Sequence, residues 1–248
     1  MIRSDDFRAA PPRGSRQTAE AVTTPLFPTL EFEQALWKGG FRHIAGIDEA
    51  GRGALAGPVS AAAVILPNTP HLARTLRGVR DSKQMTPLQR EAWAPRIKEI
   101  ALAWGVGFAS AEEIDSLGIV PATKLAVTRA LDSLSLAPDY LITDYLLLPN
   151  CLLPQTALVK GDRRSLTVAA ASVLAKTARD ALMRELDGEY LGYGFARHKG
   201  YGTPQHRAAI GRSGLCAIHR QSFNIHTDGG SKYTMGFVGR DVIPPNQG

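Results

Sequence analysis

Cysteine and long apolar runs are both scarce in this sequence. Its 248 residues include two cysteines, Cys151 and Cys216, which are too few for a disulfide framework and lack the spacing of a metal site. No stretch approaches the roughly 18 consecutive apolar residues of a membrane-spanning helix, and the N-terminus has no apolar segment typical of a secretion signal. The sequence therefore predicts a soluble cytoplasmic protein with no membrane partner.

Acidic residues are missing from one long stretch near the C-terminus. The chain has 29 basic and 23 acidic residues, a net charge of +6, yet residues 190–227 contain no Asp or Glu. Such a stretch is typical of a surface that contacts the phosphates of a nucleic acid, although a solvated surface can have the same composition. Its basic side chains are Arg197, His198, Lys199, His206, Arg207, Arg212, His219, Arg220 and His226.

Two segments without apolar periodicity flank the rest of the chain. Residues 1–28 contain Pro, Ser, Thr, Arg and Ala in no regular order, and residues 226–248 are similar, so both are predicted to be tails. Hydrophobic residues make up 44% of the sequence, which is enough to build a core. Residues 29–225 are therefore predicted to form the folded domain.

Strand-length apolar runs come early in this domain, and helical patterns are interleaved with them. The predicted strands cover residues 43–48, 58–66, 102–110, 138–144 and 156–162, and a glycine turn makes the first two a hairpin. The predicted helices cover residues 29–40, 86–101, 120–134, 165–190 and 204–212, with a glycine-rich loop at 192–203. Thr29 and Thr86 are the predicted caps of the first two helices. This order predicts an α/β protein with a mixed sheet.

Carboxylates end three of the predicted strands. Asp48 and Glu49 follow the first run, Asp144 ends the fourth and Asp162 ends the fifth. Strand ends are where α/β proteins build sites, because a rigid sheet fixes side chains that open onto solvent. Adjacent residues of a strand point to opposite faces, so Asp48 and Glu49 are expected to share a site only if the chain leaves strand geometry there, which the following glycines allow.

Clustered carboxylates without histidine or cysteine suit two kinds of chemistry. A pair of Mg²⁺ ions bound by such acids can activate a water and stabilise the leaving oxygen of a phosphodiester. Alternatively, two carboxylic acids can hydrolyse a glycosidic bond without a metal. The basic stretch favours the first chemistry, because a sugar site has no need of cations. Taken singly, each acid could also be a turn former or a helix cap.

Several spaced motifs then closely resemble bacterial ribonuclease HII, the type 2 ribonuclease H family. The resemblance extends in unbroken order over residues 29–225, and the "GRG" sequence with a short N-terminus favours ribonuclease HII over ribonuclease HIII. The matching motifs are "GIDEAGRGALAGPVSAAAVIL" (46–66), "DSK" (81–83), "EIDSLGI" (113–119), "VKGD" (159–162), "AAASVLAKTARD" (169–180), "YGFARHKGYGT" (193–203) and "HRQSF" (219–223).

The resemblance implies a fold, an activity and a cofactor. The fold is ribonuclease H-like, with a mixed central sheet flanked by helices and a C-terminal helical part that closes over a groove. The activity is two-metal-ion, Mg²⁺- or Mn²⁺-dependent endonucleolytic cleavage of the RNA strand in RNA–DNA hybrids. It extends to cutting at ribonucleotides embedded in duplex DNA. Residues 29–225 would be the catalytic domain of a monomer.

The family's four catalytic acids match four carboxylates of this sequence. Asp48, Glu49 and Asp144 would be the principal metal ligands. Asp162 would be the fourth acid, which completes the site or positions a water. Two other hypotheses remain: a hybrid-binding protein without turnover, against which the four intact acids count, and a metal-independent glycosidase, which would keep its activity after chelation.

The resemblance also implies residues that bind the substrate. Gly51, Arg52 and Gly53 match a loop whose backbone contacts the ribonucleotide, and Tyr201 matches a tyrosine that senses the 2′-hydroxyl. The 2′-hydroxyl is the group by which a protein distinguishes RNA from DNA.

Two helix cations and two departures from the family pattern complete the sequence prediction. Lys176 and Arg179 share a helical face, and one phosphate contact is expected from them, for which Lys176 is the candidate. Tyr145 follows Asp144, where the family has glycine. Ala54 stands where a proline is common in the glycine-rich loop.

Overall fold

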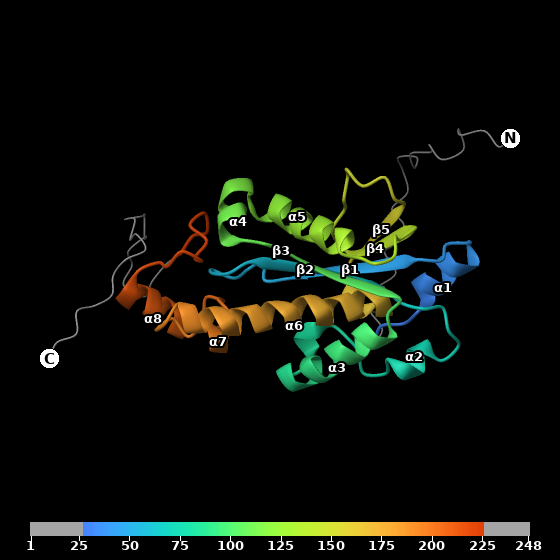
Figure 1. The fold of residues 1–248 in the computed structure, drawn as a ribbon, viewed down its shortest axis with the longest axis horizontal. Coiled ribbons are helices and arrows are strands. Elements are labelled where there is room, and N and C mark those ends of the chain that lie inside the picture. Colours follow the sequence, from blue (N-terminus) through green and yellow to red (C-terminus); the bar gives the residue numbers. More distant parts are fainter. Residues whose placement is uncertain (1–26, 226–248) are drawn as a thin grey trace, which may run out of the picture.

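The computed structural model describes residues 27–225, whose strands form one sheet in the order β3-β2-β1-β4-β5 (Figure 1). β1 pairs in antiparallel fashion with β2, and β2 with β3, whereas β4 and β5 run parallel to β1. The predicted hairpin and mixed sheet are confirmed. The strands are β1 (Ile44–Ala50), β2 (Val59–Ile65), β3 (Ala103–Ala109), β4 (Tyr140–Asp144) and β5 (Gln155–Leu158).

Helices cover both faces of this sheet. α4 (Ala111–Leu117) and α5 (Ile119–Asp132) lie on one face, whereas the long α6 (Leu166–Glu189) crosses the other face with α3 (Pro87–Ile100) beside it (Figure 1). The predicted α/β fold with flanking helices is confirmed. The other helical segments of the described residues are α1 (Glu31–Lys38), α2 (Leu72–Thr75), α7 (Phe195–His198), α8 (Pro204–Ser213) and the 3-10 turns η1 (Ser82–Gln84) and η2 (Gly161–Arg163).

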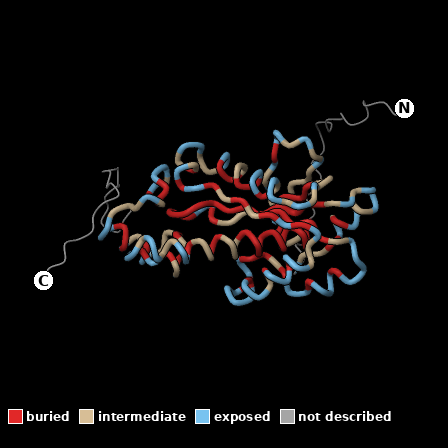
Figure 2. Tube along the Cα trace, in the orientation of Figure 1, coloured by how far each residue is buried: buried red, intermediate tan, exposed pale blue. Residues whose placement is uncertain are grey.

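Glycines in the strands let the two long helices approach the sheet closely. A Cβ at Gly46 of β1 would lie 2.4 Å from the carbonyl carbon of Thr167 in α6. One at Gly107 of β3 would lie 2.2 Å from the carbonyl oxygen of Ala126 in α5. Only glycine fits such a close approach, so the helices rest directly on the strand backbone. The central strands are consequently buried on both faces (Figure 2).

The helix starts test two predicted caps. Thr86 caps α3 as predicted, because its side chain accepts a hydrogen bond from the N–H of Gln89 while the Gln89 side chain accepts from the N–H of Thr86. The predicted cap of α1 is wrong. That helix begins at Glu31 after Leu30, and Thr29 accepts only a long hydrogen bond of 3.4 Å from the N–H of Glu31.

The C-terminal part of the described chain is more ordered than the sequence predicted. Residues 192–203, predicted to be a loop, contain the short helix α7. Together α7, α8 and the end of α6 pack against Leu55 and Ala56 after β1, so a C-terminal helical part is present as expected. The predicted tails, residues 1–28 and 226–248, lie outside the described residues except for positions 27 and 28. No helix within residues 27–225 is long and apolar enough to cross a bilayer.

A buried carboxyl group joins α1 to the start of α6. Glu33 is completely buried, and its Oε1 accepts hydrogen bonds from the Ser165 hydroxyl at 2.6 Å and from the N–H of Thr167 at 2.9 Å. Its Oε2 has no partner among the described residues. Burial raises the pKa of Glu33 above its ordinary value of 4.5, and these hydrogen bonds oppose that rise only in part.

We therefore expect the Glu33→Gln variant to gain stability relative to the parent as the pH rises. The raised pKa means that the contribution of Glu33 is fully present below its ordinary pKa of 4.5 and is lost as the pH rises through the folded-state pKa. Because glutamine does not titrate, its contribution to stability does not depend on pH. Glu33→Ala should lose about 1–3 kcal/mol by leaving buried donors unpaired. Urea unfolding from pH 4 to pH 8 measures both effects, and a stability difference between Glu33→Gln and the parent that does not change with pH would contradict the assignment.

Candidate active site

The four predicted catalytic acids lie near the C-terminal ends of β1 and β4 and on the turn η2. β1 and β4 pair in parallel register up to the residues that precede Asp48 and Asp144, so these two acids stand side by side. The prediction that Asp162 ends a strand is wrong, because β5 stops at Leu158 and Asp162 lies on η2. The N–H of Gly161 donates to Oδ1 of Asp144 at 2.8 Å, which ties this turn to the end of β4.

Asp48 and Glu49 share the site without leaving strand geometry. β1 continues through both residues to Ala50, so the expectation that the chain must depart from a strand at this point is wrong. The carboxylate of Asp48 accepts a hydrogen bond from the N–H of Glu49 at 2.8 Å. Glu49 accepts a hydrogen bond from Arg52 at 3.1 Å. The two carboxylates therefore take different partners while both border the end of β4.

The clustered carboxylates make one another harder to ionise. Burial raises the pKa of Asp48 well above its ordinary range, and the charges of Glu49, Asp144 and Asp162 add to the rise. Burial also raises the pKa of Glu49, against the effect of Arg52. The pKa of Asp162 rises to about 7 through burial and the neighbouring acids. This electrostatic strain indicates a site built for positive charge.

Two residues of the "DSK" motif belong to the same site, although no role was predicted for them from the sequence. Asp81 is buried, and its carboxylate accepts from the N–H of Lys83 at 2.9 Å and from Nε of Arg163 at 3.3 Å. Burial alone would lower the pKa of Lys83, but Asp48, Asp81 and the other carboxylates of the site raise it. The motif itself was the available signal, because it places an acid and a cation two residues apart.

The donor set fits a hard divalent cation. Mg²⁺ and Mn²⁺ prefer carboxylate oxygens and water, and the acids of this site supply only oxygen. Among residues 27–225 no three His, Cys, Asp or Glu side chains are gathered tightly enough to form a finished metal centre. Bound Mg²⁺ commonly keeps several waters and shares its shell with substrate phosphates, so a few strained carboxylates suffice.

The loop after β1, residues 51–58, is called the glycine loop, and the first two of its three glycines have different roles. Gly51 has a φ of +92°, and a Cβ there would lie 2.0 Å from Nε of Arg179. Only glycine fits at position 51, because the Arg179 side chain fills the space that a Cβ would take. A Cβ at Gly53 would meet no atom within 4 Å, so Gly53 leaves open space above the loop. The side chain of Arg52 leans back to Glu49 in an ion pair of 3.1 Å.

Tyr201 lies over two cations of α6. Its ring centroid is 5.3 Å from Nζ of Lys176 and 5.4 Å from Cζ of Arg179. Of the pair from which one phosphate contact was expected, Arg179 is not available, because its side chain is fully buried and donates to backbone carbonyls. Lys176 is partly exposed, so of the two it alone could reach a substrate.

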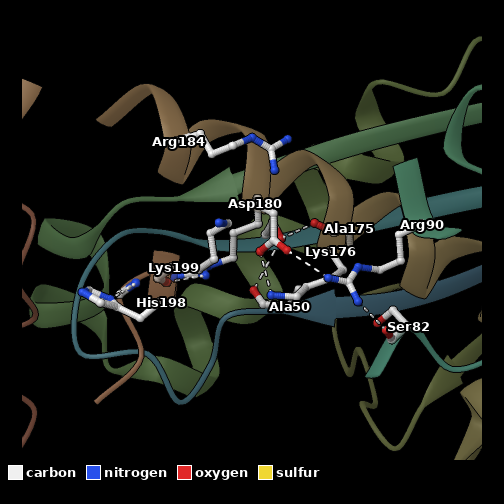
Figure 3. Close-up of polar contacts among 12 residues, drawn as sticks. Ala50, Ser82, Arg90, Ala175, Lys176, Asp180, Arg184, His198 and Lys199 are labelled. Atoms are coloured by element: carbon white, nitrogen blue, oxygen red, sulfur yellow. Dashed lines mark hydrogen bonds and ion pairs between the residues drawn. The ribbon is translucent and has the colours of Figure 1, made fainter. Parts of the chain in front are cut away.

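Lys176 belongs to an ionic network at the centre of Figure 3. Asp180 accepts from Nζ of Lys176 at 2.6 Å and from Nη2 of Arg90 at 3.3 Å. Arg90, which is buried, also donates to the carbonyl oxygen of Ser82 at 2.9 Å. This network fixes η1, and with it Lys83, relative to α6.

The basic stretch is only partly a surface. His198, His206 and His219 are buried together, with 3.1 Å between the Nε2 atoms of His206 and His219. Burial lowers the pKa of both these histidines to about 4, so they are neutral near pH 7. Arg220 is also fully buried, whereas Arg197 is exposed. Most of this stretch therefore builds the C-terminal helical part. The prediction that it forms a surface for nucleic-acid phosphates is wrong for these buried residues.

Tyr145, the departure from the family pattern, occupies a position suited to glycine. Its φ is +60°, in the left-handed region that costs a non-glycine residue about 1 kcal/mol or more. Its side chain is 75% exposed and so recovers little by packing. The N–H of Tyr145 donates to the carbonyl of Leu158 at 3.0 Å, which keeps the chain in this conformation beside Asp144.

Solved structures with this fold identify the class. Ribonuclease H2 from Pyrococcus horikoshii OT3 superposes with a TM-score of 0.60 at 28% identity, covering 73% of this chain and 94% of that chain. The ribonuclease HII of an Archaeoglobus fulgidus complex with PCNA gives 0.59 at 28% identity, over 71% and 91%. A Bst ribonuclease HIII in complex with Mn²⁺ gives 0.53 at 21% identity, covering 81% and 69%, and adds evidence for the fold alone. The protein has the ribonuclease H-like fold.

Sequence relatives define the family. The family model of ribonuclease HII matches residues 45–226. Ribonuclease HII of Geobacillus thermodenitrificans (strain NG80-2) is 53% identical over 194 residues, which are 78% of this chain and 73% of that protein. The protein of Syntrophotalea carbinolica (strain DSM 2380 / NBRC 103641 / GraBd1) is 52% identical over 203 residues, 80% and 95%. The chain belongs to the ribonuclease HII family, which makes it a ribonuclease H hydrolase that acts on RNA-containing nucleic acid.

Replacing Tyr145 by glycine should stabilise the protein by roughly 1 kcal/mol. The change removes the left-handed strain, and the extra freedom of glycine in the unfolded chain offsets only part of that gain. Tyr145→Val should destabilise instead, because a β-branched residue tolerates positive φ poorly. Thermal and urea unfolding measure the order of the three proteins. Equal stability of parent and Tyr145→Gly would mean that the left-handed conformation costs nothing here.

Proposed function

We propose that this protein is a divalent-metal-dependent endoribonuclease that cleaves the RNA strand of RNA–DNA hybrids and cuts at ribonucleotides embedded in duplex DNA. The observation that carries the proposal is the group of carboxylates at the ends of β1 and β4 and on η2, where burial and mutual charge raise the pKa of Asp48, Glu49 and Asp162. Family membership supplies the substrate class, and residues 29–225 are proposed as the catalytic domain.

The metal would be Mg²⁺ or Mn²⁺, held by Asp48, Glu49 and Asp144. Two such ions, when bound, activate a water and stabilise the leaving oxygen of the phosphodiester. The Mn²⁺ complex of a ribonuclease HIII with this fold supports the choice of ion. Asp162 is proposed to complete the negative site and to orient water, since it lies on the turn tied to Asp144.

Around these acids the chain supplies positive groups for the substrate. Lys83 lies among the carboxylates on η1 and is suited to a phosphate oxygen next to the reacting one. Lys176 is proposed as a second phosphate contact, although Asp180 already neutralises part of its charge. Gly51, Arg52 and Gly53 would present backbone groups to the sugar.

Ribonucleotide recognition is assigned to the glycine loop and Tyr201. Backbone N–H groups can approach a sugar closely where no Cβ stands in the way, and the space above Gly53 is open. The Tyr201 ring, held over Lys176 and Arg179, would add an apolar face and a hydroxyl beside the same sugar. The 2′-hydroxyl is the group that these contacts would read.

Asp48→Asn, Glu49→Gln and Asp144→Asn should each lower cleavage at least about 100-fold. Amides keep the shape but weaken a hard-cation site, and losing a direct ligand should cost no less than losing its supporting partners. Single-turnover cleavage of an RNA–DNA hybrid in Mg²⁺, with hybrid affinity measured in EDTA, gives the result. Hybrid affinity should survive.

The matched control is Glu99→Gln, which neutralises an exposed acid near the end of α3. It should cleave at the parental rate. The metal assignment is wrong if Asp48→Asn keeps full activity at ordinary Mg²⁺, or if EDTA leaves the parent active.

Gly53→Ala should lower cleavage at a lone ribonucleotide in DNA about tenfold while leaving the melting temperature unchanged. The new methyl group meets no protein atom but stands where the sugar would approach. Loss of one hydrogen bond in the transition state corresponds to roughly this factor. Gly188→Ala, also in open space but near the end of α6, is the control.

Tyr201 is tested on the same duplex. Tyr201→Ala should cripple cleavage, whereas Tyr201→Phe keeps the ring and should retain part of the activity. Metal titration of each variant distinguishes a loss of ribonucleotide recognition from damage to the carboxylate site. If Tyr201→Ala and Gly53→Ala both cleave at the parental rate, neither Tyr201 nor the glycine loop reads the ribonucleotide.

A further inference from the structure

Two buried arginines hold the glycine loop by its carbonyl oxygens. Arg220, which follows α8, donates from Nη2 to the carbonyl of Gly51 at 2.7 Å, from Nη1 to that of Arg52 at 2.7 Å and from Nε to that of Gly57 at 3.0 Å. Its side chain is completely buried. A guanidinium group has a fixed fork of five N–H donors, so three well-spaced bonds define the path of the loop.

Arg179 of α6 holds the other half of the loop in the same way. It donates from Nη2 to the carbonyl of Ala56 at 3.1 Å, from Nε to that of Pro58 at 2.8 Å and from Nη1 to that of Lys199 at 2.9 Å. The third bond joins the loop to the segment that carries Tyr201. Two segments far apart in the sequence are thus fastened to one cation.

Neither arginine has a carboxylate partner among the described residues. No ion pair there includes Arg179 or Arg220. Burial lowers the pKa of Arg220 to about 9, and the like charge of Arg179 adds to this, yet the group stays protonated at pH 7. A buried cation without a counter-ion is costly, and here carbonyl dipoles and the ring faces of Tyr201 and Phe223 compensate it. A purely structural role would not require two such charges beneath one loop.

The direction of these bonds determines where the loop points its donors. Because a peptide unit is planar and trans, its C=O and the next N–H point in opposite directions. The carbonyls of Gly51 and Arg52 turn inward to Arg220, so the N–H groups of Arg52 and Gly53 turn outward. Within residues 27–225 these two N–H groups make no hydrogen bond, whereas the N–H groups of Ala54 and Leu55 do.

We propose that Arg220, assisted by Arg179, is a positioning residue for ribonucleotide recognition: it aims the N–H groups of Arg52 and Gly53 at the sugar-phosphate of the ribonucleotide and places behind them a positive charge that no carboxylate neutralises. This inference rests on the proposed function. The same loop carries Arg52, whose ion pair with Glu49 connects the recognition loop to the carboxylate site. A change in the path of the glycine loop should therefore reduce the preference for RNA over DNA more than it reduces metal affinity.

The test compares two arginine-to-lysine changes. Arg220→Lys keeps a charge but loses the fork, whereas Arg184→Lys alters an α6 arginine whose partner is Glu91, away from the loop. Affinities for a duplex with one ribonucleotide and for the same duplex as all-DNA are measured in EDTA. Melting temperature and Mn²⁺ affinity are measured alongside.

The parent should prefer the ribonucleotide duplex, and Arg220→Lys should lose about tenfold of that preference, the factor for one lost hydrogen bond. Its affinity for the all-DNA duplex and for Mn²⁺ should stay within about twofold of the parent, and Arg184→Lys should match the parent throughout. An unchanged preference in a folded Arg220→Lys protein overturns the inference. A parent with no preference, by contrast, refutes ribonucleotide recognition itself.

Amide hydrogen exchange on the parental protein covers the case in which Arg220→Lys does not fold. The N–H groups of Arg52 and Gly53 should exchange rapidly in the free protein. They should slow on binding the ribonucleotide duplex in EDTA but not on binding the all-DNA duplex. Protection already present in the free protein, or equal protection by both duplexes, would show that Arg220 does not aim these donors at a ribonucleotide.

Discussion

Parallel pairing of β1 with β4 is the constraint on which the site depends. It fixes Asp48 and Asp144 at adjacent strand positions, and the turn after β5 adds Asp162. α6 then closes over Asp48, because Gly46 lets its backbone rest on β1. Burial and like charge together raise the carboxyl pKa values, so the ionised form of these acids is disfavoured until a cation compensates its charge. Stability is thus lost locally in exchange for a cation site.

Positive charge is concentrated on the opposite side of the glycine loop. Arg179 and Arg220 lie beneath its carbonyls, while the acids lie at the strand that leads into it. The loop therefore separates buried cations from buried anions over a few residues. Such fixed charges need no reorganisation when a substrate arrives, which is what makes preorganised sites effective. The neutral histidine cluster, in which Nδ1 of His206 lies 3.0 Å from the carbonyl oxygen of Tyr201, completes this support without adding charge.

Elements with strong local signals were predictable from the sequence. The hairpin of β1 and β2, the capped helix α3 and the apolar pattern of α6 follow from turn glycines, the Thr86 cap and spacing. The family motifs supplied the four acids. Their strand register could not be read in this way, because the continuation of β1 through Glu49 depends on pairing with β2.

Predictions made from charge alone were wrong for the side chains that the fold buries. Arg179 and Arg220 read as surface cations because composition does not reveal that six carbonyl oxygens solvate them. Burial of His206 and His219 depends in the same way on contacts between distant segments. Lys83 was visible within "DSK", but only the fold brings that motif to the acids.

The central claim is that the acids of β1 and β4 form a divalent-cation site. Anomalous diffraction from crystals grown with Mn²⁺ tests it directly, because manganese scatters anomalously and its ligands can be read from the map. The account predicts manganese bound by Asp48, Glu49 and Asp144, with water in its remaining positions. Saturating Mn²⁺ that binds elsewhere, or that leaves these carboxylates without metal, would contradict it.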